Sequence, residues 1–208
     1  CGGCGADAGG ADIAGRCFCC VAAFVVLTLV VLGADLVLKS WSFRHVGPEP
    51  VKLTGQPEVD LATLRELEPV VVIPGVLDLK LTLNTGALFG MGSGKQWFFV
   101  LVSIIATAAI GVIFYRSPRN PPIRQRFVRV SLALILAGAL GNLYDRVFFN
   151  AVRDMLYLFP GVELPWGLSW PGSGQREVYP WIFNIADVAL VTGVIMMLAI
   201  MFFGDRPG

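Results

Sequence analysis

Three apolar segments carry charged and amide side chains at spacings that place them on one face of a helix. Spacings of three and four residues make neighbours on a helical surface, and an acid four residues before a base is the favourable order. The groups are Asp35 with Lys39, Asn142 with Asp145 and Arg146, and Asn184 with Asp187. A charge inside a membrane span costs about 2.5–3.5 kcal/mol on insertion scales, so such residues mark functional sites.

The chemistry that these side chains offer is that of paired carboxylates. The single histidine, His45, lies beyond the first apolar segment as we expect it to end, and no ligand set for a metal is apparent. Two carboxylates that share a proton can activate water, one as base and one as acid. Asp187 has no cation within a helical turn, so we expect it in such a pair, with Asp145 or Asp154 as its partner.

Purely structural roles are the alternative for each charged group. Asp187, which stands among apolar residues without a cation, is the hardest to explain in this way. The alternatives are an interfacial ion pair for Asp35 and Lys39, a bundle-stabilising pair for Asp145 and Arg146, and a surface pair for Arg153 and Asp154.

The composition indicates a membrane protein. Of 208 residues, 55% are hydrophobic and 15% are charged, against about 25% charged in ordinary globular chains. The net charge of +1 gives no basic field for nucleic acid, and all five cysteines lie in the first twenty residues, so no disulfide holds the fold. We expect a disordered Gly/Cys-rich tail over 1–16 and one domain over 17–204, with transmembrane helices at about 17–38, 95–115, 128–146 and 181–203.

The charge pattern of the connections predicts the orientation. The link 115–129 contains five arginines and no acid, and its prolines predict a non-helical segment. By the positive-inside rule this link and both termini are cytoplasmic. The segments 40–95 and 146–180 then face outward, with the polar groups near the outer leaflet.

The outer segments are predicted to contain a small β-sheet. Residues 77–84 alternate strictly between apolar and polar, which is typical of a half-buried strand, and 70–73 followed by Pro74-Gly75 is a candidate partner. Residues 160–180, with four prolines and two tryptophans, favour an irregular loop with interfacial aromatics. The predicted fold class is therefore a mainly α membrane protein of four transmembrane helices, with a small extracytoplasmic β-sheet cradle.

Four sequence blocks follow one another on this topology. They are Asn84-Thr85-Gly86-Ala87-Leu88-Phe89-Gly90, Gly141-Asn142-Leu143-Tyr144-Asp145-Arg146, Asp154, and Phe183-Asn184-Ile185-Ala186-Asp187, preceded by Asp35-x-x-x-Lys39. Together they resemble the lipoprotein signal peptidase (signal peptidase II) family, over roughly residues 20–203.

The resemblance implies an aspartic endopeptidase of the bacterial inner membrane. Such an enzyme cuts a prolipoprotein before its diacylglyceryl-modified cysteine, with membrane lipid around it and without a metal or organic cofactor. The motif match assigns Asp154 and Asp187 as the catalytic pair and Asp145 as a structural aspartate, and it implies a monomer. The supporting or substrate-binding positions are Asp35, Lys39, Asn84, Gly86, Phe89, Asn142, Asp145, Arg146, Asn184 and Ala186.

The sequence also departs from the family pattern. Leu88 replaces a small residue, Gln96 stands near a position where the family often has arginine, and the stretches 42–76 and 155–186 are longer than usual. The competing hypotheses are a small transporter, which should show inverted repeats, an inactive homologue, and an unrelated intramembrane aspartic protease. Neither the repeats nor the Gly-x-Gly-Asp block of that protease class is visible.

Overall fold

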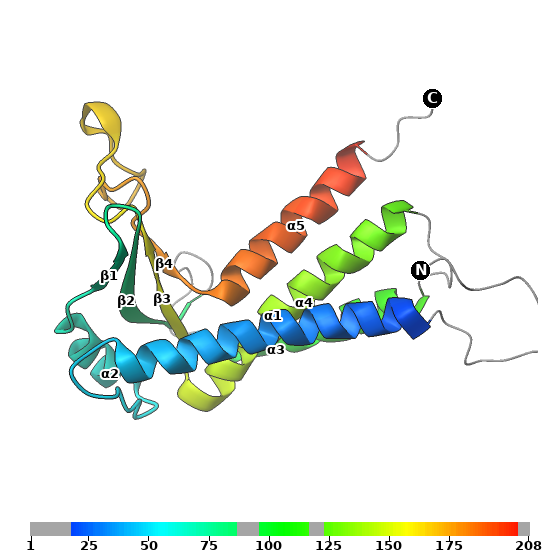
Figure 1. Cartoon of the computed structure of the whole chain (residues 1–208), viewed down its shortest axis with the longest axis horizontal. Helices are drawn as coiled ribbons and strands as arrows, with labels where there is room; N and C mark the ends of the chain where they lie inside the picture. Colours follow the sequence, from blue (N-terminus) through cyan, green and yellow to red (C-terminus); the bar gives the residue numbers. More distant parts are fainter. Residues whose placement is uncertain (1–17, 87–95, 117–122, 204–208) are drawn as a thin grey trace, which may run out of the picture.

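The fold is mainly helical, with one small sheet at the end of a helical bundle (Figure 1). This computed structural model describes residues 18–86, 96–116 and 123–203. The predicted tail over 1–16 and the motif residues Leu88 and Phe89 lie outside the described residues.

Four helices are long and apolar enough to cross a membrane, as predicted. They are α1 (Phe18–His45), α3 (Gln96–Arg116), α4 (Ile123–Phe149) and α5 (Ile185–Phe203). Many apolar side chains on their outer surfaces are exposed, because lipid rather than protein is their solvent. The start of α1 and the end of α5 lie at the end of the bundle opposite the sheet (Figure 1).

Several predicted boundaries were wrong. Helix α1 continues to His45, so the histidine does lie in a helix. Helix α4 begins at Ile123, which places three arginines of the predicted non-helical link inside it, because its prolines all precede that residue. Helix α5 begins only at Ile185, since the apolar residues before it form a strand.

The sheet has four antiparallel strands in the order β1-β2-β3-β4. The predicted strands are confirmed as β1 (Val70–Ile73) and β2 (Leu77–Asn84). The unpredicted strands are β3 (Val152–Leu158) and β4 (Ile182–Phe183). In the register, Thr82 lies opposite Asp154.

One face of the sheet has its own apolar core beside the C-terminal end of α1. Leu79, Leu81 and Leu83 of β2 alternate into this core and meet Phe43 of α1 and Met155 of β3. An unpredicted short helix, α2 (Pro57–Arg65), contributes Leu64 to it. The sheet is thereby packed against the end of α1 and held in place over the bundle.

Helices α4 and α5 are in close contact through glycines. A Cβ atom added at Gly138 would lie 2.3 Å from the backbone oxygen of Ala186, and one at Gly193 would lie 2.8 Å from that of Ser131. Small residues at such positions let helix backbones approach in a membrane. The first turn of α5 therefore lies directly against α4.

We predict that Gly138→Ala lowers stability, because the new methyl group must push α5 away from α4. Overpacking of this kind costs about 1–3 kcal/mol. Gly111→Ala is the matched control, since a Cβ at Gly111 of α3 meets nothing within 4 Å. Thermal unfolding in detergent should show a lower midpoint for the first variant only, and equal midpoints would contradict the close contact.

Candidate active site

The predicted polar residues meet where α1, α4 and α5 end against the sheet. Asp35, Lys39, Asn142, Asp145 and Asn184 are all buried there. Asp154 joins them from β3, and Asp187 from the first turn of α5. Residues separated by up to about 150 positions in the chain thus form one cluster, as the helical spacings predicted.

Lys39 is the centre of the cluster and is fully buried, at 0% exposure. Its Nζ lies 2.7 Å from Asp35 Oδ2 and 3.1 Å from Asp145 Oδ2. It also donates a hydrogen bond of 3.2 Å to Asn142 Oδ1. A buried ammonium group is tolerated only with such partners, so these contacts fix the part of α1 near the sheet against α4.

Asp145 pairs with Arg153. The Arg153 side chain donates to Asp145 Oδ1 at 2.8 and 3.0 Å, and the Arg153 backbone N–H donates to Asp145 Oδ2 at 3.0 Å. The hypothesis of a surface pair between Arg153 and Asp154 was therefore wrong, since both residues are buried and Arg153 binds Asp145. Arg153 fastens the start of β3 to the end of α4.

Arg146 connects α4 to the backbone just after β2. Its Nη2 donates a 2.8 Å hydrogen bond to the Gly86 carbonyl oxygen, and its guanidinium lies over the Phe99 ring of α3. Asn84 Oδ1 accepts a 2.9 Å hydrogen bond from the Gly86 backbone N–H. Residues 84–86, the described part of the block that begins at Asn84, are thus held at the cluster.

The start of α5 places Asp187. The Asn184 side-chain oxygen accepts from the Asp187 backbone N–H at 2.9 Å, and Asp187 Oδ2 accepts from the Asn184 backbone N–H at 3.3 Å. This is a reciprocal capping box. Asp35 Oδ1 caps the same turn by accepting from the Ala186 backbone N–H at 2.9 Å.

Two asparagines connect the carboxylates of Asp154 and Asp187. Asn184 Nδ2 donates to Asp154 Oδ1 at 2.6 Å and to Asn142 Oδ1 at 3.2 Å. Asn142 Nδ2 in turn donates to Asp187 Oδ1 at 2.8 Å. Of the two carboxylates left open as partners of Asp187, Asp154 is the one in this amide network, whereas Asp145 is occupied by Lys39 and Arg153.

The two linked carboxylates differ in environment. Asp154 is only 1% exposed, whereas Asp187 is half-buried. Burial raises the pKa of Asp154 well above its ordinary value, and the charge of Asp187 raises it further. Lys39 and hydrogen bonds from Asn184 and Asn84 act on this pKa in the opposite direction without cancelling the rise.

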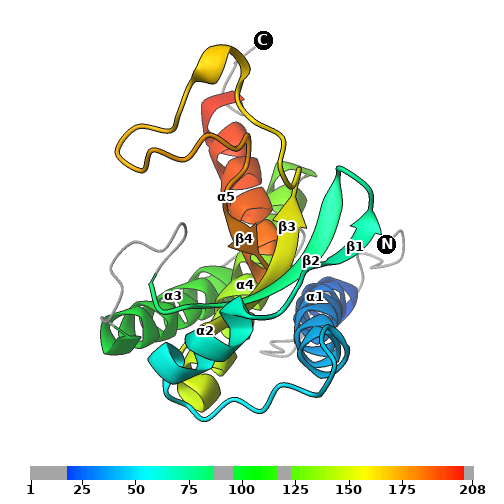
Figure 2. The same cartoon turned by 90° about the vertical axis from the view of Figure 1, so that its left-hand side faces the viewer.

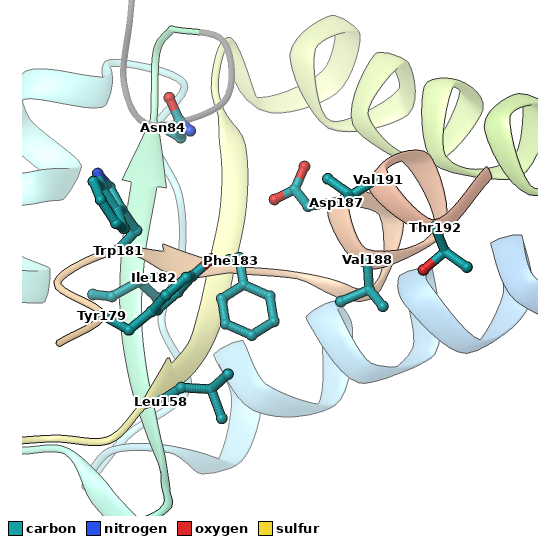
Figure 3. Close-up of a pocket in the computed structure, with 10 residues that line it drawn as sticks. All are labelled: Asn84, Leu158, Tyr179, Trp181, Ile182, Phe183, Asp187, Val188, Val191 and Thr192. Atoms are coloured by element: carbon teal, nitrogen blue, oxygen red, sulfur yellow. The ribbon is translucent and has the colours of Figure 1, made fainter. Parts of the chain in front are cut away.

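Two pockets reach Asp187. The larger, of about 390 Å³, is mostly apolar and is walled by Tyr179, Trp181 and Phe183 next to α5 (Figure 3). The smaller, of about 200 Å³, lies among α3, α4 and α5. Asn84 and Asp187 line both pockets, and Figure 3 shows the Asp187 carboxylate pointing into the space below Asn84.

The aromatic wall was missed by the sequence analysis. Tyr179, Trp181 and Phe183 are spaced two residues apart, which is the period of one strand face and was a usable signal. As for metals, the described ranges contain no set of three His, Cys, Asp or Glu side chains placed to hold an ion.

The chain is similar to known proteins. A family model described as Signal peptidase (SPase) II matches residues 27–203. The chain belongs to the signal peptidase II family. Membership in this family implies a membrane protease that removes signal peptides from prolipoproteins.

Individual relatives agree with the family match. The lipoprotein signal peptidase of Latilactobacillus sakei is 34% identical over 88% of this chain and 95% of its own length. That of Geobacillus kaustophilus is 38% identical over 67% of this chain and 79% of its own. A bacterial membrane enzyme solved by the in meso method at 1.9 Å is 25% identical, covers 88% of this chain and 94% of its own, and has a TM-score of 0.62.

We predict that Lys39→Met strongly destabilises the protein, because Asp35 and Asp145 would lose their shared cation inside the fold. Breaking a buried ion pair from one side costs about 3–5 kcal/mol. Lys80→Met, at an exposed position on β2, is the control. The midpoint of thermal unfolding should fall far more for Lys39→Met, and similar midpoints would show that the buried ammonium group is dispensable.

The raised pKa of Asp154 predicts a pH-dependent effect on stability. The folded state binds the Asp154 proton more tightly than the unfolded chain, so the resulting stabilisation is complete at low pH and is lost as pH rises through the raised pKa. Asp154→Asn cannot ionise and should therefore gain in melting temperature relative to the parent as pH rises above the ordinary aspartate pKa of about 3.9. A difference in melting temperature that stays constant or shrinks above this pH would refute the raised pKa.

Proposed function

We propose that this chain is an aspartic endopeptidase that cleaves prolipoproteins before the diacylglyceryl-modified cysteine, with Asp154 and Asp187 as its catalytic pair. The observation that carries the proposal is the bridge through Asn184. This one side chain bonds to Asp154 Oδ1, while the Asn184 oxygen and backbone N–H bond to Asp187. The bridge holds a buried carboxylate beside a second one that lines two pockets.

The charges of the cluster favour one proton on this pair. Four carboxylates are grouped with three cations, so the cluster is neutral when one carboxylate is protonated. The carboxylates other than Asp154 and Asp187 each contact a cation directly. We assign the proton to Asp154 and Asp187 jointly, as in other carboxylate pairs that activate water, because burial and the charge of Asp187 raise the pKa of Asp154. The members of the cluster are Asp35, Asp145, Asp154, Asp187, Lys39, Arg146 and Arg153.

A shared proton gives a balanced route for hydrolysis. The ionised carboxylate takes a proton from a water molecule, whose oxygen attacks the peptide carbonyl. The protonated carboxyl group donates its proton toward the carbonyl oxygen, and proton transfer to the leaving nitrogen then breaks the C–N bond. Asp187 is reachable from both pockets, and Asn84 lies at the same pockets as a donor for the developing oxyanion.

The apolar pocket suits a lipid-modified substrate. Its wall of Tyr179, Trp181 and Phe183 continues along Val188 and Val191 of the span α5, so it can accept acyl chains or an apolar signal segment that arrives through the membrane. We place the cluster near the outer leaflet of the bacterial inner membrane and both termini in the cytoplasm, because the arginines of the α3–α4 connection lie at the opposite ends of these helices. We expect a monomer.

The proposal predicts that Asp154→Asn and Asp187→Asn each abolish cleavage. Loss of a general acid or base lowers the rate about 10²–10⁴-fold. Purified variants in detergent would be incubated with a diacylglyceryl-modified prolipoprotein, and the smaller mature product would be scored by gel shift.

Asp78→Asn is the matched control, because Asp78 is also a buried carboxylate of the sheet but lies outside the cluster. It should leave cleavage intact. Cleavage that survives in Asp154→Asn and is lost in Asp145→Asn, at unchanged melting temperature, would move the partner role to Asp145. A folded parent chain that fails to cut a verified substrate would favour an inactive homologue.

A further inference from the structure

Residues 159–181 form an arm between β3 and α5 that the proposed chemistry does not use. Figure 1 shows it in yellow and orange, projecting beyond the sheet on the side away from α1. In Figure 2 it lies above the sheet, whereas α2 lies below the sheet. The arm is therefore a feature of this chain that calls for its own explanation.

Backbone hydrogen bonds and aromatic contacts hold the arm in one shape. Its two limbs pair through Val178 N–H to Val162 O at 2.8 Å and Leu164 N–H to Arg176 O at 2.7 Å. Trp170 packs against Trp181 with ring centroids 4.8 Å apart. Since Trp181 is also a wall of the larger pocket, the arm is tied directly to the candidate active site.

Tyr157 fixes the base of the arm to the sheet. Its hydroxyl lies 2.5 Å from Glu177 Oε2, and the Trp170 indole N–H donates to the Glu177 carbonyl oxygen at 3.0 Å. The remaining charges of the arm, Glu163 and Arg176, neutralise each other in an ion pair of 3.0 Å. The limbs therefore carry no unmatched cation that would attract an acidic partner.

The tip of the arm is apolar, uncharged and exposed. Residues 164–175 contain no charged side chain. Trp166 is 91% exposed and Leu168 is 55% exposed. Trp166 also adopts a positive φ of 56°, which a bulky residue rarely does. An exposed apolar tip on a rigid support is typical of an interaction surface.

The position of the tip indicates which partner it meets. Tryptophans gather where a membrane meets water, with the apolar ring toward lipid and the N–H toward the headgroups. Exposed tryptophans stand near the sheet end of two spans, Trp41 on α1 and Trp97 on α3. The arm supplies a third, Trp166, in the segment that leads through β4 into the span α5.

We infer that the arm docks on the phospholipid surface beside α5, inserting Trp166 and Leu168 into the headgroup region. This surface is continuous with the membrane around α5. Docking would hold the aromatic wall of the larger pocket at the lipid boundary, where a lipid-modified chain leaves the bilayer. The inference needs only that the chain spans a membrane, and it does not depend on the assignment of the catalytic pair.

Tryptophan fluorescence in vesicles tests this inference. The parent and Trp166→Phe would be reconstituted in phosphatidylcholine vesicles, and the difference between them gives the emission of Trp166. We expect this emission to be quenched by phosphatidylcholine brominated near the headgroup end of its acyl chains, and to be protected from aqueous iodide. Quenching by iodide without quenching by bromolipid would overturn docking. Resistance to both quenchers would mean that protein covers the tip, which also overturns it.

A charged substitution at the tip provides a second test. Leu168→Asp should reduce the bromolipid quenching of Trp166 and expose it to iodide, because a carboxylate resists entry into the headgroup region. Val59→Asp is the matched control, since Val59 is 53% exposed but lies on α2, on the other side of the sheet. An equal effect of both variants, or none from Leu168→Asp, would overturn the role of the tip.

Discussion

The burial of one ammonium group organises the half of this molecule that carries the sheet. Lys39 Nζ has no access to solvent, so Asp35, Asp145 and Asn142 must surround it, and these three partners come from two helices. The partners then act beyond Lys39. Asp35 caps the first turn of α5, and Asp145 binds Arg153 at the start of β3. The positions of α5 and of β3 therefore both depend on the contacts of Lys39 between α1 and α4.

The helix packing and the polar network require each other. The glycines of α4 allow the α5 backbone to approach so closely that a Cβ at Gly138 would collide with the Ala186 carbonyl. A Cβ at Gly141 would lie 2.6 Å from Asp35 Oδ2, so the same helix face must also leave room for the carboxylate that caps α5. Without this approach, Asn142 could not reach Asp187 at 2.8 Å. Small residues thus hold the helices together at this site. In lipid, helices associate through the close packing of their backbones, whereas in a soluble core the burial of large apolar side chains has this role.

The elements that have a local sequence signal were predicted correctly. The features that depend on residues distant in the sequence were missed. The spans follow from the length of apolar runs and β1 from an apolar run before a turn. Strand β2 follows from a period of 2, and the grouping of polar residues on the helices follows from the helical period. Arg153 was assigned to its neighbour Asp154, because side chains on opposite faces of a strand are adjacent in the sequence although they point to different partners. Residues 181–184 were assigned to a helix, since a short apolar run has no period that separates strand from helix. Helix α2 was missed because its nine residues have only a weak apolar pattern, and its place is set by packing on β2.

A strand is the element that can bring the second carboxylate to α5. Two carboxylates on neighbouring spans would each need compensation at membrane depth, where each ion removed from water costs several kcal/mol. Strand β3 instead runs across the helix ends, and its alternation points Arg153 to Asp145 and Asp154 to Asn184. One strand therefore delivers both a cation that neutralises the structural carboxylate and a buried carboxyl group beside Asp187. The remaining negative charge stays at the end of the bundle, where two pockets lead to it and water can enter, which hydrolysis requires.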